Sequence, residues 1–184
     1  MACRTITQLK RGLISKSVPS NDNLKEMFFP RISKSENLLK LIEEKQLSNN
    51  IKQAIIQQYN EILLYNIVDF DYKFLLAPQV AITYEENNLP IIIYPRFNPL
   101  IPESKVWNHT ENELQRMVGF YANKKGISEK KLMTFYTEIE KLCHYYDLNE
   151  DDILLNPSNI GYHPVLGLRI IDYGLAENNK LFNY

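Results

Sequence analysis

Three prolines in one short segment set the strongest limit on how this chain folds. Pro95, Pro99 and Pro102 all fall within residues 95–107. Proline has no backbone N–H and a fixed φ, so this segment cannot be a regular helix or a central strand. We therefore expect a hinge here, between an N-terminal part rich in β-structure and a C-terminal part that is mainly helical.

The N-terminal part contains segments with the apolar spacing of strands and segments with the apolar spacing of helices. Residues 5–32 alternate loosely between apolar and polar and predict two short strands, a turn and a third strand. Residues 33–36 match a capping box and predict a first helix. Apolar residues then recur every three or four positions over 51–63, which predicts a second helix.

Two further β-rich runs complete the part before the hinge. Residues 80–84 and 91–94 are separated by Glu85-Glu86-Asn87-Asn88, a polar turn, so they predict an antiparallel hairpin. After the hinge, the capping box at residues 110–113 opens one predicted helix, and an apolar stripe predicts another from about Ser128 to Asp147.

Composition narrows the class of protein. The 184 residues suffice for one domain or two small lobes, and 45% hydrophobic with 23% charged residues is normal for a globular protein. The formal net charge of −1 favours neither nucleic acid nor an anionic membrane as a partner, so we expect neither.

The cysteines and the apolar segments bear on the compartment. Cys3 and Cys143 fit neither a metal-ligand spacing nor a disulfide framework, which favours a reducing compartment. No segment approaches the roughly 18 apolar residues of a membrane helix. We expect a cytoplasmic protein, or one delivered into a host cytosol without a classical signal peptide.

The stretch from residue 156 to 174 carries the clearest chemical pattern. Asn159 ends a turn, a short strand follows, and a second apolar strand returns to Asp172, which precedes an aromatic residue and a glycine. Such a hairpin places an amide oxygen and a carboxylate side by side, which suits Mg²⁺ held together with phosphate. Either residue also fits an ordinary turn, so the pattern alone leaves that alternative open.

This stretch and the order of the predicted elements resemble the protein-kinase fold in a small, truncated form. Leu155-Asn156-Pro157-Ser158-Asn159-Ile160 is similar to the tail of a kinase catalytic loop, and Ile170-Ile171-Asp172-Tyr173-Gly174 to the metal-binding turn. Asn159 and Asp172 are 13 residues apart, the usual separation in that family.

The resemblance implies a fold and a ligand set. The fold would be α+β and two-lobed, with residues 1–97 as a lobe of antiparallel sheet plus two helices, and 98–184 as a truncated helical lobe. ATP and Mg²⁺ would be the cofactors, with Asn159 and Asp172 as metal ligands.

Other cofactor-binding residues follow from the same resemblance. Ile92-Ile93-Tyr94-Pro95-Arg96-Phe97 is similar to the fifth strand and hinge of a kinase, which implies that Tyr94 and Phe97 line an adenine site. The helix carrying Glu61 resembles helix C, whose carboxylate pairs with a strand cation; Lys25 and Arg31 are the candidates for that cation. Glu61 also fits a solvated or capping carboxylate.

The departures from the family pattern bear on activity. Leu154 stands where the catalytic base belongs, and Asp151 and Asp152 are the only weak substitutes nearby. Gly12 is what remains of a glycine-rich loop, and it fits an ordinary turn equally well. The chain ends soon after Gly174, as in some small bacterial effector kinases and phage kinase-like proteins.

Two functions are therefore open. The first is a pseudokinase or weak kinase that binds ATP and Mg²⁺ and acts on or through a protein partner. The alternative is a non-catalytic interaction or inhibitor module, of kinase-like or unrelated α+β fold, that binds no nucleotide.

Overall fold

A computed structural model describes residues 4–19, 24, 27–29, 36–44, 47–102, 109–148 and 156–174. They form an α+β protein whose chain divides into two compact units. Unit 1 comprises Met1–Val68, Pro78–Arg96 and Gly174–Tyr184, and unit 2 comprises Asp69–Ala77 and Phe97–Tyr173. Within the described ranges, no helix has both the length and the apolar character needed to cross a membrane.

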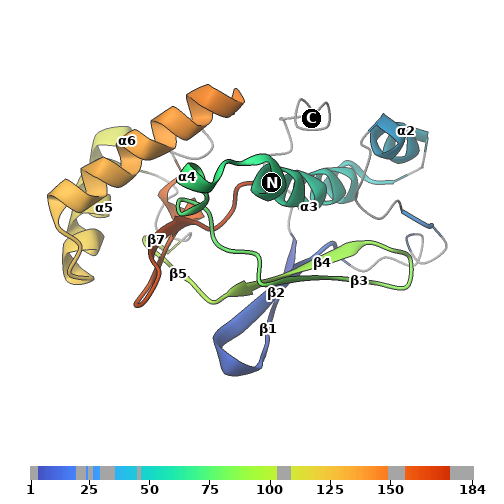
Figure 1. The fold of residues 1–184 in the computed structure, drawn as a ribbon, viewed down its shortest axis with the longest axis horizontal. Coiled ribbons are helices and arrows are strands. Elements are labelled where there is room, and N and C mark those ends of the chain that lie inside the picture. Colours follow the sequence, from blue (N-terminus) through green and yellow to red (C-terminus); the bar gives the residue numbers. More distant parts are fainter. Residues whose placement is uncertain are drawn as a thin grey trace. The chain divides into compact units, whose positions relative to one another are not determined.

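Unit 1 contains a four-stranded antiparallel sheet (Figure 1). Its strands are β1 (Thr5–Gln8), β2 (Leu13–Ser17), β3 (Ala81–Tyr84) and β4 (Pro90–Pro95), in the spatial order β1-β2-β4-β3. The predicted hairpin of residues 80–84 and 91–94 is confirmed as the pair β3 and β4.

Of the strands predicted in residues 5–32, the first two are present in the structure and the third is not. Strands β1 and β2 are present, and the turn Lys10–Gly12 between them has positive φ at Arg11 and Gly12. A third strand around residues 27–29 was predicted, and this prediction is wrong: those residues have no strand hydrogen bonding. The Phe29 N–H instead donates to the Asn87 carbonyl at 2.9 Å, so this segment joins the turn before β4.

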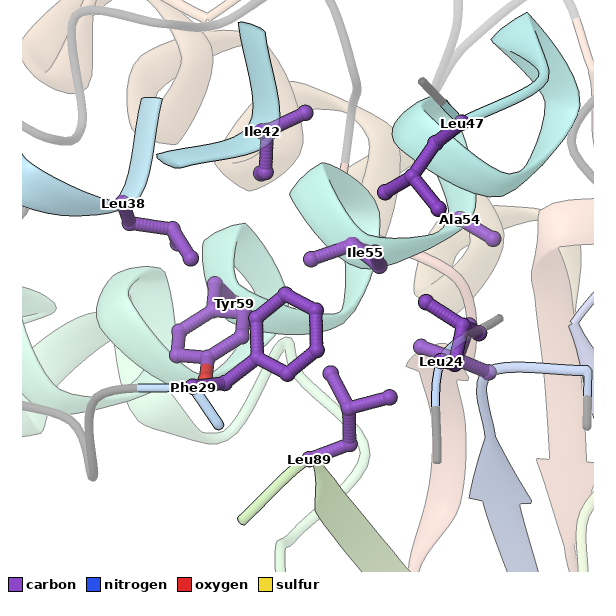
Figure 2. Packing of buried hydrophobic residues seen from close by; sticks show 10 residues of the cluster. Leu24, Phe29, Leu38, Ile42, Leu47, Ala54, Ile55, Tyr59 and Leu89 are labelled. Atoms are coloured by element: carbon purple, nitrogen blue, oxygen red, sulfur yellow. The ribbon is translucent and has the colours of Figure 1, made fainter. Parts of the chain in front are cut away.

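The helices of unit 1 form at the predicted positions. They are α2 (Glu36–Glu44) and α3 (Asn49–Ile67). Figure 2 shows residues of α2, α3 and the turn before β4 in one hydrophobic core. The core consists of Val18, Leu24, Phe29, Leu38, Ile42, Leu47, Ala54, Ile55, Tyr59 and Leu89. Burial raises the pKa of the Tyr59 hydroxyl far above its usual value, so Tyr59 stays neutral in this core.

Unit 2 contains two helices whose first residues are set by N-terminal caps. α5 (Glu111–Lys124) begins at Thr110 with a complete capping box, and α6 (Glu129–Tyr146) begins at Ser128, whose hydroxyl accepts from the Lys131 N–H. Both helices confirm their sequence predictions. The short helix α4 (Phe70–Lys73) was not predicted; the Asp69 N–H before it donates to the Tyr146 hydroxyl at 2.8 Å, which ties α4 to α6.

A small sheet accompanies these helices. Strands β5 (Asn98–Pro99), β6 (Ile160–His163) and β7 (Gly167–Ile170) are antiparallel in that order, and the turn η3 (Pro157–Asn159) leads into β6. The predicted C-terminal hairpin is thus confirmed. The proline-rich segment contributes β5 at the edge of this sheet, where a missing N–H is tolerated.

Candidate functional site

The most unusual feature of unit 1 is a charged cluster inside its core. The alternation of β2 turns Lys16 toward the same face of the sheet as Ile92 and Tyr94 on β4. There the Lys16 ammonium lies 2.9 Å from Oε1 of Glu61 on α3, and the Glu61 side chain has no exposed surface. A buried ion pair thus connects the sheet to the helix.

A second cation reaches the same carboxylate. The Arg4 guanidinium, just before β1, bonds to Oε2 of Glu61 and donates to Oε1 of Gln58 at 3.3 Å. The Gln58 amide in turn donates to the carbonyls of Lys16 and Pro90, at 2.7 and 2.9 Å. Burying a charge is costly unless it is paired and hydrogen-bonded, and here both carboxylate oxygens are bonded.

The cations predicted to pair with Glu61, Lys25 and Arg31, lie outside the described residues, so that pairing stays a prediction. Within the described ranges, Lys16 and Arg4 contact Glu61. One signal for Lys16 was available, because it stands in phase with Ile14, the apolar residue on the inward face of β2. A lysine on an apolar face requires a carboxylate partner.

Tyr94 and Phe97, predicted to line an adenine site, are both buried. Tyr94 belongs to unit 1 and is 1% exposed, with the Lys16 ammonium 5.1 Å from the centre of its ring. Phe97 belongs to unit 2, is 7% exposed, and contacts the His163 ring at 5.4 Å between centroids. Both side chains therefore serve core packing within their own units.

The predicted metal ligands lie on neighbouring backbone segments of unit 2. Asn159 is the last residue of η3, and its carbonyl accepts from the Ile171 N–H at 2.7 Å, directly beyond the β6–β7 ladder. Asp172 follows Ile171, so the hairpin brings together two residues that are 13 apart in sequence. Both side chains are half-buried.

The residues after Asp172 are fixed by close packing. The Tyr173 hydroxyl donates to the Ala77 carbonyl at 2.9 Å within unit 2. Gly174, in unit 1, lies against α3: a Cβ added to it would be 2.1 Å from the Gln57 carbonyl oxygen and 2.9 Å from Cβ of Glu61. Only glycine fits there, so the glycine of the Asp-Tyr-Gly triplet and Glu61 lie together.

The donor set at Asn159 and Asp172 suits Mg²⁺ better than a transition metal. Mg²⁺ is commonly held by one or two carboxylates plus the phosphates of its substrate, with water completing its shell. No group of three or more His, Cys, Asp or Glu side chains that could hold a metal occurs in the described ranges. Asn159 and Asp172 therefore fit a metal ion that is bound together with a phosphate ligand.

The remaining catalytic candidates have no structural description. Asp151, Asp152 and Leu154 lie outside the described residues. The expectation that Leu154 replaces the catalytic base therefore stays a prediction.

Comparison of the chain with protein-family models, with curated proteins and with solved structures finds no match. The function must be inferred from the geometry of the two units.

Proposed function

We propose that this protein is a kinase-like nucleotide-binding protein with little or no phosphotransferase activity. In unit 1, Lys16, held by Glu61, would contact phosphate. In unit 2, Asn159 and Asp172 would bind Mg²⁺. Its biological effect would then pass through a protein partner.

The observation that carries the proposal is the Lys16–Glu61 ion pair at 2.9 Å, between an inner strand and a helix. A buried pair is weak evidence of stabilisation, because an apolar pair of similar volume often serves the core equally well. Its presence here is better explained by a need for a fixed cation. Phosphoryl-transfer proteins use such a cation to position phosphates, mainly through electrostatics.

Thermal unfolding with and without ATP and Mg²⁺ tests nucleotide binding. ATP with Mg²⁺ at 100 times its dissociation constant should stabilise the chain by about 2.7 kcal/mol. Direct titration of Lys16→Met should show weakened binding. Lys40→Met is the matched control, since Lys40 is exposed on α2, with its ammonium 3.8 Å from the Glu44 carboxylate. No shift at millimolar ATP would refute the proposal.

The proposed binding of Mg²⁺ by Asp172 is tested with a separate variant. Asp172→Ala should abolish the dependence of nucleotide binding on Mg²⁺, whereas Asp71→Ala should not, because Asp71 is exposed on α4. A dependence that persists in Asp172→Ala would place the metal elsewhere.

A phosphotransfer assay tests the third part of the proposal, the lack of catalysis. With Leu154 at the base position we expect phosphotransfer to be absent or very slow, because positioning alone leaves the attacking hydroxyl without a proton acceptor. Robust labelling of a substrate would contradict this part of the proposal and leave nucleotide binding intact.

A non-catalytic interaction module is the second candidate, and exposed aromatic residues favour it. In unit 2, Phe70 is 89% exposed, Phe74 48% and Tyr145 64%. The Tyr145 ring lies 6.2 Å from that of Tyr72 on α4, so these side chains gather where α4 meets the end of α6. Large exposed apolar groups that cluster are typical of protein-binding surfaces.

A further inference from the structure

One face of the β6–β7 hairpin in unit 2 carries hydrogen-bond donors that the proposed nucleotide site does not use. Gly161 pairs with Arg169, and His163 pairs with Gly167. Residues directly opposite each other share a face, and so do alternate residues along a strand. Arg169 and His163 therefore project from the same face.

The position of Arg169 on that face is defined by two short approaches. Its Nη1 donates to the Leu168 carbonyl at 2.6 Å and lies 3.9 Å from where a Cβ of Gly167 would be. The guanidinium thus lies next to Gly167, whose partner on the facing strand is His163. Burial lowers the pKa of Arg169, and no acidic side chain of the described residues forms an ion pair with it.

His163 is oriented by its own turn. Its Nδ1 accepts from the backbone N–H groups of Val165 and Leu166, both at 3.2 Å. A nitrogen that accepts is unprotonated, so the neutral imidazole carries its hydrogen on Nε2. The Phe97 ring, 5.4 Å away between centroids, packs against the imidazole. His163 is therefore a positioned Nε2–H donor on the face of the hairpin that also carries Arg169.

We propose that this face of the hairpin binds a phosphate group, held by the Arg169 guanidinium and the Nε2–H of His163. A guanidinium fork bonds two oxygens of an oxyanion, and the imidazole supplies a donor for another. A phosphate monoester offers three strong acceptor oxygens and a carboxylate only two, which favours phosphate. This phosphate site uses none of the residues named in the nucleotide proposal and does not depend on it.

The full-length chain should be titrated with inorganic phosphate and with glycerol phosphate, following the His163 ring and Arg169 side-chain resonances by NMR. Sodium chloride keeps the ionic strength constant, since screening alone would shift these signals. Acetate provides the carboxylate comparison. Inorganic phosphate that binds as tightly as the monoester identifies free phosphate as a sufficient ligand.

Three variants decide the assignment. Arg169→Gln should weaken phosphate binding about ten- to a hundredfold, the usual range for a hydrogen bond to a charged group. His163→Asn places an amide oxygen near the Nδ1 position and so preserves the turn, yet it removes the Nε2–H and should weaken binding about two- to tenfold. Arg116→Gln, on the exposed face of α5, should change nothing.

The proposal is overturned if Arg169→Gln binds phosphate as the unaltered chain does, or if acetate binds as tightly as phosphate. Amide spectra of each variant establish that it folds. Should Arg169→Gln fail to fold, His163→Asn still decides the matter: unchanged binding in that variant refutes the role of the imidazole and with it the two-donor site.

Discussion

The candidate polar groups of unit 1 lie in its core, whereas those of unit 2 lie on a half-buried hairpin. In unit 1, Lys16 and Glu61 are nine-tenths or more buried and bonded to each other. In unit 2, Asn159, Asp172 and Arg169 are partly accessible to solvent. Function and stability are therefore coupled in unit 1, because a buried charge that loses its partner destabilises the fold. In unit 2 they are separable.

The largest effect on stability is expected when the buried Lys16–Glu61 ion pair is broken. Lys16→Met leaves the Glu61 carboxylate short of one partner and should lower the free energy of unfolding by about 3–5 kcal/mol. Asp172→Ala should cost about 1 kcal/mol or less, since its surroundings are partly solvated. Urea unfolding measures both. Equal losses for the two variants would contradict the comparison.

A double-mutant cycle sharpens the same test. Lys16→Met combined with Glu61→Leu removes both charges of the pair and should be less destabilised than the sum of the two single variants, because neither Lys16 nor Glu61 is left without the other. Arg4 loses its carboxylate partner equally in Glu61→Leu and in the double variant, so this loss does not enter the coupling energy. Strict additivity would mean that the 2.9 Å contact contributes no coupling energy.

Glycine replacements give the next largest effect. Gly174→Ala forces a Cβ to within 2.1 Å of the Gln57 carbonyl oxygen and should cost about 1–3 kcal/mol. The control, Gly119→Ala in α5, has no atom within 4 Å of the added Cβ. It should stabilise by about 0.5–1 kcal/mol, because alanine is the better helix former. Unfolding midpoints that move in the same direction would show the close approach at Gly174 to be wrong.

A smaller effect is expected at the start of α5. Thr110→Ala removes the hydroxyl that caps this helix and should cost about 1 kcal/mol. Thr137→Ala, at an exposed position inside α6, should be neutral or slightly stabilising. Calorimetric unfolding at neutral pH distinguishes the two, and a loss of equal size in both would argue against a capping role.

The same cap predicts the smallest effect, which depends on pH. Hydrogen bonds from the Thr110 backbone and side chain hold the pKa of the exposed Glu113 carboxyl below its usual value. A depressed pKa stabilises the folded state above the unfolded pKa, and this contribution is lost as the pH falls through the folded pKa. The stability difference between the unaltered chain and Glu113→Gln should therefore narrow from neutral to acidic pH; a constant difference would refute it.

The local features of both units were predictable from the sequence. The capping residues Thr110 and Ser128 fix their helices through bonds to residues three positions away. The hairpin that pairs Ile160 with Ile170 is likewise a short-range feature, so the adjacency of Asn159 and Asp172 followed from it. The described part of the Pro-rich segment, residues 95–102, contains no regular helix, as predicted. The edge strand β5 within it was not predicted, because its partner β6 lies some 60 residues later in the chain.

Patterns within short windows of the sequence predicted α2, α3, α5 and α6, the hairpins β3–β4 and β6–β7, and the α+β class, because these depend on periodicity, capping and turn chemistry. The contacts of Lys16 and Arg4 with Glu61 were visible only in the folded structure. These pairs span 45 and 57 residues, and strand register rather than local pattern brings them together. The same holds for Gly174 against Gln57, and for Arg169 and His163 on one face of their hairpin. Short-range sequence patterns therefore determine the helices and strands, whereas tertiary packing determines which side chains contact each other.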